Sequence, residues 1–487
     1  MLFVFDNTYA QLPSRFYARQ SPVAVAGPRL VKLNQALAVE LGLDHDRLSS
    51  PDGLAVLAGN VVPDGAEPLA MAYAGHQFGS FVPQLGDGRA ILLGEVLNLR
   101  GERLDIQLKG SGRTPFSRAG DGRAWLGPIL REYIVSESMH ALGIPTTRSL
   151  AVVTTGEPVY RESALPGAVL TRVARSHVRV GTFEYFSTRR DTEAVRRLAD
   201  YVIARHYPEA EADERPYRAL LHSVIARQAR LIAQWLGVGF IHGVMNTDNM
   251  SIAGETIDYG PCAFMDSYHP ATVYSSIDRG GRYAYGNQPR IAQWNLSRLA
   301  QSLLPLIDED QSKAIDEAQA AIDAFPECFD QAYLDRFRDK LGMLETHSDD
   351  ADLISALLKT MAETRADFTN TFRALCEAAD GTDDGVRDAL GGSAAGNDWL
   401  GRWRARLARE AVKPATRATR MRRANPAVIP RNHRVEAALE AAVTGNLDPL
   451  DDLSRILASP WEERPDSLPY RCPPEPHEAV HQTFCGT

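Results

Sequence analysis

The sequence predicts an α+β protein with two lobes, a β-rich amino-terminal lobe and an enlarged helical carboxy-terminal lobe. Strand-like runs are concentrated before about residue 190, and helical spacing of apolar residues prevails after it. No internal repeat, low-complexity tract or long linker divides the 487 residues, of which 44% are hydrophobic. A strand-rich half followed by a helical half in one continuous chain is typical of the α+β class.

The amino-terminal elements are predicted from the spacing of apolar residues. Residues 28–38 have helical spacing after a proline, so we expect a first helix there. Strands are expected at 90–96 and 103–109, the second because it alternates apolar and polar residues. A helix is expected over 124–142. Further strand-like runs lie at 149–154 and 168–173.

The carboxy-terminal part is predicted to be helical. Helices are expected at 215–236, 289–305, 309–324, 349–377 and 434–443. We expect three units along the chain. They are an amino-terminal extension with the β-rich lobe over 1–180, the helical lobe over 181–465, and a tail with Cys485 over 466–487.

One segment carries residues in the order of a protein-kinase active site. His242 and Asn249 are seven residues apart, and Asp258-Tyr259-Gly260 follows them. Kinases place His-Arg-Asp, an Asn and Asp-Phe-Gly in this order, because Asn and Asp oxygens hold Mg²⁺ on ATP. The predicted fold is therefore a two-lobed protein-kinase-like fold, with nucleotide between the lobes.

The proton acceptor of this site is predicted to have moved along the loop. Val244 stands where kinases have the catalytic Asp, and it cannot accept a proton. Asp248 is next to Asn249 and becomes the candidate general base, with a solvated loop Asp as the alternative. Asn249 and Asp258 are hard oxygen ligands suited to Mg²⁺ or Mn²⁺. His242 is interpreted as a structural histidine.

Two further features have a functional and a structural interpretation. Gly86, Gly88 and Arg89 form a loop before a strand, where backbone N–H groups and a guanidinium can approach phosphates. A plain hairpin turn is the alternative. Lys109 ends a strand and Glu132 lies on the next helix, as in the kinase pair that aims a lysine at phosphates. A surface salt bridge is the alternative.

The same lobe carries more positive charge than ATP binding alone needs. Arg172 and Arg179, with Arg89 and Lys109, would place four cations around a triphosphate. That number fits attack at the α-phosphate, because both outer phosphates then leave as pyrophosphate. Arginines on a solvated face are the alternative. Asp121-Gly122 comes before the helix that carries Glu132. The amides at the start of a helix favour anions, so this position could contact phosphate. An N-cap role for Asp121 is the alternative.

The overall composition excludes several classes of protein. A net charge of −9 offers no general electrostatic footprint for nucleic acid or an anionic membrane. No apolar run approaches the roughly 18 residues of a membrane span, and residues 1–6 lack the pattern of a signal peptide. The odd set of five cysteines has no C-x-x-C pair, which argues against a disulfide framework or structural zinc. We expect a cytoplasmic monomer.

Long strings of residues resemble one family, the selenoprotein O (SelO/YdiU) pseudokinases, which transfer AMP to proteins. These strings are 5–9, 73–79, 108–118, 242–249, 258–261 and 425–432. The resemblance implies a kinase fold that binds ATP inverted, so that the α-phosphate meets the base. It also implies Asp248 as proton acceptor and Asn249 and Asp258 as metal ligands. The nucleotide contacts that it implies are Gly86, Gly88, Arg89, Lys109, Asp121, Gly122, Arg172 and Arg179.

The residues and the resemblance together predict a protein adenylyltransferase that uses ATP with Mg²⁺ or Mn²⁺. Its expected substrates are Ser, Thr or Tyr hydroxyls of proteins. Two alternatives stay open, a phosphotransferase with the same site and a catalytically silent nucleotide-binding scaffold. The resemblance further implies a redox link between the carboxy-terminal Cys485 and the segment after Asp258, where Cys262 is found. Two ordinary thiols are the alternative.

Overall fold

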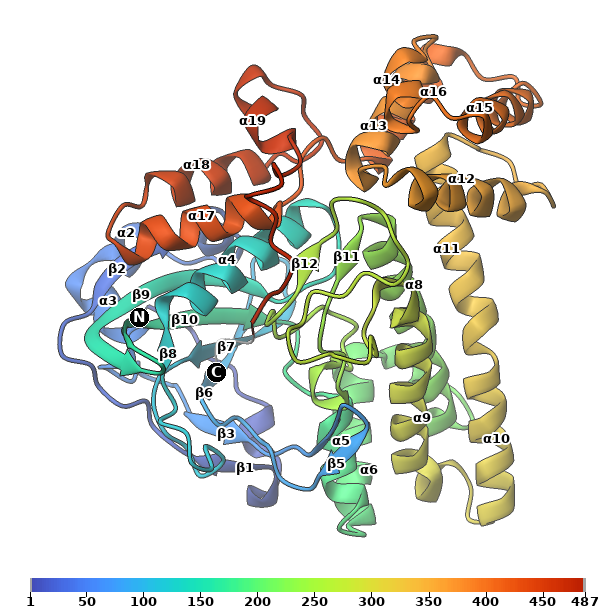
Figure 1. Ribbon diagram of the computed structural model, residues 1–487. Coiled ribbons are helices and arrows are strands. Elements are labelled where there is room, and N and C mark those ends of the chain that lie inside the picture. Colours follow the sequence, from blue (N-terminus) through green and yellow to red (C-terminus); the bar gives the residue numbers. More distant parts are fainter. Residues whose placement is uncertain (1, 485–487) are drawn as a thin grey trace.

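The computed structural model of the protein describes residues 2–484. An antiparallel sheet with flanking helices forms one region, and long helices form the other (Figure 1). Among the described residues, no helix is long and apolar enough to cross a membrane.

Within residues 2–484 the main sheet has eight strands in the order β1-β3-β6-β7-β10-β9-β2, with β8 pairing on β10. Neighbouring strands pair antiparallel. The strands of this sheet are β1 (Tyr17–Arg19), β2 (Arg29–Leu33), β3 (Leu69–Met71), β6 (Ala90–Leu97), β7 (Arg103–Lys109), β8 (Ala124–Trp125), β9 (Arg148–Tyr160) and β10 (Ala164–Ala174). Two small hairpins stand apart, β4 (Gly75–Gln77) with β5 (Ser80–Val82), and β11 (Phe240–Ile241) with β12 (Ala263–Phe264).

Helices cover both faces of the sheet because successive strand residues point to opposite sides. Leucines of α1 (Gln35–Glu40), α2 (His45–Ser49) and α3 (Pro51–Leu57) pack with Val169 and Val173 of β10. Leu170, between those valines, packs instead with α4 (Leu126–Ala141) on the other face. Helices α17 (Asn432–Val443) and α18 (Asp448–Leu457) lie on α4, so a late segment of the chain completes this layer (Figure 1).

The remaining helices form the second region. They are α5 (Val180–Ser187), α6 (Thr192–His206), α7 (Pro208–Glu211), α8 (Pro216–Gly237), α9 (Gln288–Ile307), α10 (Gln311–Asp323), α11 (Phe325–Leu341), α12 (Asp350–Thr364), α13 (Phe368–Ala378), α14 (Asp384–Ala389), α15 (Ala394–Leu407), α16 (Pro414–Ala424) and α19 (Leu468–Arg471). Short 3-10 turns lie at η1 (Tyr9–Gln11), η2 (Ser14–Phe16), η3 (Thr247–Asn249), η4 (Tyr285–Asn287) and η5 (Pro465–Ser467).

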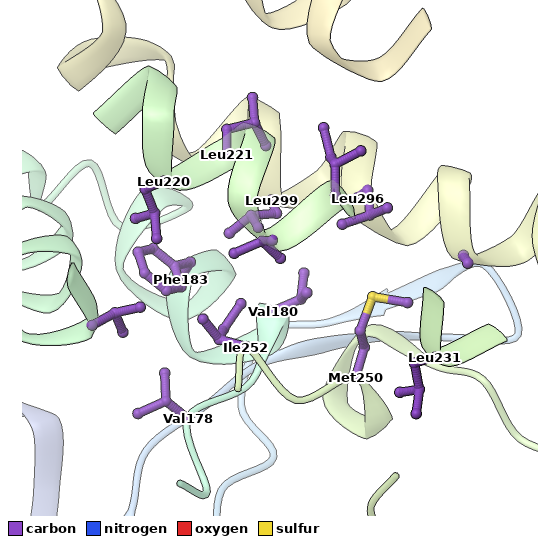
Figure 2. Close-up of a cluster of buried hydrophobic side chains, with 14 of the residues drawn as sticks. Val178, Val180, Phe183, Leu220, Leu221, Leu231, Met250, Ile252, Leu296 and Leu299 are labelled. Atoms are coloured by element: carbon purple, nitrogen blue, oxygen red, sulfur yellow. The ribbon is translucent and has the colours of Figure 1, made fainter. Parts of the chain in front are cut away.

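An apolar core supports the loop that carries the candidate catalytic residues. Met250 and Ile252 follow η3 and pack among buried leucines of α8 and α9 (Figure 2). Val180 and Phe183 of α5 belong to the same cluster (Figure 2). Burying aliphatic side chains contributes about 1.5–3 kcal/mol each, so the loop rests on a rigid base.

Most predicted elements are confirmed, and two are wrong. Residues 29–33, predicted as the start of a helix, form strand β2, because their backbone pairs with β9. The helix starts only after Asn34, whose Oδ1 accepts a hydrogen bond from the Leu37 N–H. The predicted helix over 349–377 is two helices, since the chain turns at Arg365 with a φ of 55°.

Candidate active site

The sequence-predicted site residues meet at a cavity of about 510 Å³. This volume lies in the range of small-molecule sites. The cavity is lined by Gly86, Gly88, Arg89, Lys109, Asp121, Gly122, Arg172, Arg179, Asp248, Asn249 and Asp258. Glu132 lies behind this lining, against Lys109. Residues from both regions of the chain, far apart in sequence, therefore share one site.

Asp258 is surrounded by cations. Its carboxylate accepts a hydrogen bond from Arg172 Nη2 at 2.9 Å and a second one from Arg179 Nη1, and Lys109 Nζ lies 3.9 Å away. Burial alone would raise the pKa of Asp258, but Arg179, Arg172 and Lys109 hold this pKa well below its usual range. The backbone adopts a φ of 61°, unusual for a residue with a side chain. The carboxylate is thus ionised and turned toward the cavity.

Lys109 and Glu132 form a buried pair. Lys109 Nζ donates to Glu132 Oε2 at 2.5 Å, and Arg172 Nε donates to Glu132 Oε1 at 2.7 Å. The exposed fractions of these side chains are 11%, 1% and 2% for Lys109, Glu132 and Arg172. The surface salt bridge considered as the alternative is therefore wrong. One carboxylate on α4 orients a lysine from β7 and an arginine from β10 toward the cavity.

Asp248 differs in its surroundings from Asp258. Its Oδ2 accepts a hydrogen bond from Gln77 Nε2 at 3.3 Å, and its Oδ1 is buried with no hydrogen-bond partner among the described residues. Burial raises the pKa of Asp248 to about 6. Gly75 lies against it, since a Cβ at that position would be 2.4 Å from Oδ1. The carboxylate thus keeps one buried oxygen whose hydrogen-bonding capacity is not used among the described residues.

The β4–β5 hairpin holds the Asp248 loop in place. The His76 N–H donates to Thr247 Oγ1 at 2.7 Å, and the Phe78 N–H donates to Asn246 Oδ1 at 3.1 Å. Glu184 of α5 joins both segments, because its carboxylate contacts the His76 Nδ1 and accepts a hydrogen bond from Thr247. Three hydrogen bonds to two consecutive loop residues, Asn246 and Thr247, leave the neighbouring backbone at Asp248 little freedom.

Asn249 is oriented by its own loop. Its Nδ2 donates to the Val244 carbonyl at 2.9 Å, which leaves Oδ1 as the atom for a ligand. His242 contacts the Ile257 carbonyl through Nε2 at 2.9 Å and is almost fully buried. This placement agrees with the structural role expected for His242. The side chains of Asn249 and His242 thus each contact a backbone carbonyl, of Val244 and Ile257, which explains why an amide and an imidazole are found at these two positions.

The glycine loop is packed beneath a second loop, and this packing requires glycine. Gly86 has a φ of 72°, and a Cβ there would lie 2.3 Å from the Phe116 ring. A Cβ at Gly88 would lie 2.9 Å from the Phe116 carbonyl. Ser117 donates to the Gly88 carbonyl, and Thr114 donates to the Asp87 carbonyl at 2.6 Å. The loop is more than a plain turn, because a second segment fixes its shape.

Asp121 lies at the rim of the cavity and is not an N-cap. Helix α4 begins at Leu126, with Trp125 as its N-cap. Asp121 instead pairs with Arg161 at 2.8 Å and accepts a hydrogen bond from the Arg123 N–H. The N-cap interpretation of Asp121 is therefore wrong.

Arg89 belongs to the lining of the cavity, where its side chain is half-buried.

The last described residues lie against the segment after Asp258. The Thr483 N–H donates to the Tyr274 carbonyl at 2.8 Å, and Thr483 Oγ1 donates to the Pro261 carbonyl at 2.6 Å. Phe484 lines the cavity and is 68% exposed. Figure 1 shows the tail running from α19 to this position. Cys485, predicted to be a redox residue, lies outside the described residues.

Several cavity residues were not predicted from the sequence, and three of them make contacts that shape the site. Gln77 contacts Asp248, Arg161 pairs at the rim, and Phe116 packs on the glycine loop. Gln77 and Phe116 belong to the strings that carry the family resemblance, so the signal was present without a role attached to it. Arg161 lies in the turn between two strands, and no local pattern singles it out.

Comparison with known proteins identifies the family to which the chain belongs. Residues 2–458 match the family model described as protein adenylyltransferase SelO. The chain belongs to this family. The resemblance to the SelO family expected from the sequence is thereby confirmed.

Relatives in the SelO family are similar along their whole length. The chain is 63% identical over 487 residues to a protein of Bradyrhizobium diazoefficiens named protein nucleotidyltransferase YdiU, covering 100% of this chain and 99% of that protein. Proteins of the same name from Methylorubrum extorquens and Rhizobium etli are 62% and 59% identical over 495 and 488 residues. These alignments also cover 100% of this chain, with 99% and 97% of the two relatives.

Proposed function

We propose that the protein transfers AMP from ATP to Ser, Thr or Tyr hydroxyls of acceptor proteins and releases pyrophosphate. The observation that carries the proposal is the carboxylate of Asp248, with one unpartnered oxygen, in the same cavity as the cations Arg89, Lys109, Arg172 and Arg179. Membership in a family of protein adenylyltransferases supports the same reaction. We also propose a two-lobed kinase-like fold, supported by the Lys109–Glu132 pair and by Asn249 and Asp258 at kinase spacing.

In this proposal Asp248 accepts the proton of the acceptor hydroxyl. The hydroxyl oxygen attacks the α-phosphorus, the bond to the bridging oxygen breaks, and that oxygen leaves with pyrophosphate. Lys109, Arg89, Arg172 and Arg179 neutralise the negative charge that develops on the outer phosphates. General-base catalysis contributes roughly 10²–10⁴-fold in rate. Asp248 suits this role because its Oδ1 is unpartnered and its loop is held by the β4–β5 hairpin.

The donor set fits Mg²⁺ or Mn²⁺. Asn249 Oδ1 and the Asp258 carboxylate would hold the ion, which would neutralise phosphate charge. No group of three or more His, Cys, Asp and Glu side chains among the described residues could hold a metal alone. Two protein oxygens are nevertheless sufficient for an ion that also binds phosphates and water. Arg172 and Arg179 now occupy the Asp258 oxygens, so phosphates that attract these arginines would release the carboxylate.

Labelled ATP distinguishes the proposal from its alternatives. Incubation of the full chain with Mg²⁺ or Mn²⁺, a protein acceptor and α-labelled ATP should leave label on the acceptor, whereas γ-labelled ATP should not. Transfer of γ-label alone would indicate a phosphotransferase. Nucleotide binding without transfer of either label would indicate a scaffold.

A further inference from the structure

A set of arginines without carboxylate partners lies beside the candidate active site. Residues 279–298 contain four arginines and no Asp or Glu, in a chain with 62 acidic residues. Among the described residues, no carboxylate lies within ion-pair distance of Arg279, Arg282, Arg290 or Arg298. Arg279 and Arg290 are exposed, and the other two are half-buried. In a chain of net charge −9, this segment is locally cationic.

Helix α9 presents part of this set on one face. Arg290, Trp294 and Arg298 are four residues apart and therefore lie along one side of the helix. The helix contains no Asp or Glu, so neither arginine has a carboxylate one turn away. The nearby Asp278 does not neutralise them, because its buried carboxylate accepts hydrogen bonds from the N–H groups of Arg282 and Tyr283 at 2.9 and 2.7 Å.

Trp294 organises two of the guanidinium groups. The Cζ atoms of Arg282 and Arg298 lie 4.9 and 5.1 Å from the centre of the Trp294 rings. Cation–π contacts of this kind hold long side chains in place, which lowers the entropy cost of binding a partner. Tryptophan and arginine are also the residues most enriched among binding hot spots. The surface is thus preorganised for an anionic partner.

This surface continues to the candidate base through the β4–β5 hairpin. The Trp294 ring meets the His76 ring edge-on, with centroids 5.2 Å apart. The His76 N–H bonds Thr247, and the next residue, Gln77, bonds Asp248. Arg282 lies close to the same hairpin, because a Cβ at Gly79 would be 3.6 Å from its guanidinium carbon. A partner on the arginines would therefore be close to Asp248.

We propose that Arg282, Arg290, Trp294 and Arg298 form a docking surface for an acidic segment of the acceptor protein, close to the hydroxyl that is modified. This inference rests on the proposed function, because it assumes that the acceptor protein approaches Asp248 from the side of the β4–β5 hairpin. Charge complementarity selects the occupant. Each guanidinium group of the surface can bind a carboxylate through two parallel hydrogen bonds. Acidic residues near the hydroxyl then become a specificity determinant for the acceptor.

Direct binding tests the surface independently of catalysis. The probe is a short fluorescent peptide with one serine flanked by glutamates, compared by fluorescence anisotropy with the same peptide flanked by glutamines. The full chain should bind the glutamate peptide more tightly, and added salt should reduce the difference. Arg298→Gln and Arg290→Gln should each weaken binding about three- to fivefold. Arg423→Gln, an exposed arginine of α16, changes net charge equally and should have no effect.

The outcomes separate this inference from the proposed function. If α-label is transferred equally to both peptides and neither arginine variant changes their binding, the docking surface is wrong and the adenylyltransferase stands. If the glutamate peptide binds through the arginines but never receives α-label, the docking surface stands and the proposed function is wrong. Tight binding of an oligonucleotide, with no preference for the glutamate peptide, would replace the acidic protein segment by nucleic acid and overturn the inference. Arg282→Gln serves as a further variant, with unfolding temperature as the check on folding.

Discussion

Two aspartates ten residues apart in the sequence have opposite surroundings, and this difference supports the separate roles proposed for them. Asp258 is bound by two arginines, which keep its carboxylate ionised. Asp248 has one glutamine and an unpartnered oxygen, and burial raises its pKa to about 6. An acceptor hydroxyl needs a carboxylate of the second kind, because an oxygen already paired to a cation is a weak proton acceptor.

We predict that substitutions at these two positions have different effects. Asp248→Asn should leave ATP binding within about twofold of the wild type and slow AMP transfer by about 10²–10⁴-fold, the usual contribution of a general base. Asp258→Ala should abolish metal-dependent nucleotide binding. Calorimetric titration with a non-hydrolysable ATP analogue, with and without Mn²⁺, measures binding, and α-label transfer measures rate. An Asp248→Asn protein that loses nucleotide affinity as severely as Asp258→Ala would make Asp248 a ligand.

Single residues of the site were predictable where a motif links them in sequence. Asn249 and Asp258 follow His242 at kinase spacing, and Lys109 and Glu132 lie at the end of a strand and on the next helix. Gln77 was not predicted, because it contacts Asp248 across 171 residues and no local pattern records that distance. The contacts of Asp258 with Arg172 and Arg179 also could not be read from the chain, since they depend on packing in space.

At the scale of elements, the β4–β5 hairpin positions the Asp248 loop, and Gly75 is where the two come closest. A Cβ at this position would lie 2.4 Å from Asp248 Oδ1 and 2.9 Å from its Cβ. Gly75→Ala should therefore displace the carboxylate and slow AMP transfer by about 10²-fold, with little change in ATP affinity. Steady-state kinetics with separate determination of kcat and KM for ATP measures both. Ser80→Ala, an exposed position in the same hairpin, is the matched control.

Elements were predictable when their own periodicity agreed with their surroundings. The strands at 90–96 and 103–109 and the helix at 215–236 appear nearly as expected, as β6, β7 and α8. The prediction of a helix at residues 29–33 was wrong because pairing with β9 overrides the helical spacing of their apolar residues. Long-range pairing of this kind becomes visible only when the sheet order is known.

At the scale of the whole molecule, Glu255 links stability to pH. It is buried, and one of its oxygens accepts a hydrogen bond from the Arg175 N–H at 3.0 Å. Burial raises its pKa from 4.5 to about 8. Between these two values the unfolded chain has lost this proton and the folded chain retains it, so the group's contribution to stability falls as pH rises.

We predict that Glu255→Gln removes this pH dependence. The free energy of unfolding of the wild type, relative to Glu255→Gln, should decrease by up to about 1.4 kcal/mol per pH unit between about pH 5 and pH 8. Glutamine keeps an acceptor for the Arg175 N–H, so the fold is retained. Urea unfolding of both proteins across this range measures the difference. A difference that does not change with pH would mean that Glu255 is already ionised in the folded chain.

Near the carboxy-terminal end of the described residues, Thr483 contacts the segment that follows Asp258. Thr483 bonds the Pro261 carbonyl, next to the buried Cys262, and Cys485 follows two residues later in the sequence. We predict that oxidation links Cys485 to Cys262, a bond that requires the two Cα atoms to lie within about 7 Å. Transfer activity should then change with reductant in the wild type and not in Cys485→Ser, whereas Cys328→Ser, at an exposed cysteine elsewhere, should respond like the wild type. Peptide mapping of oxidised protein that found Cys485 unlinked, or linked to Cys472, would contradict the prediction.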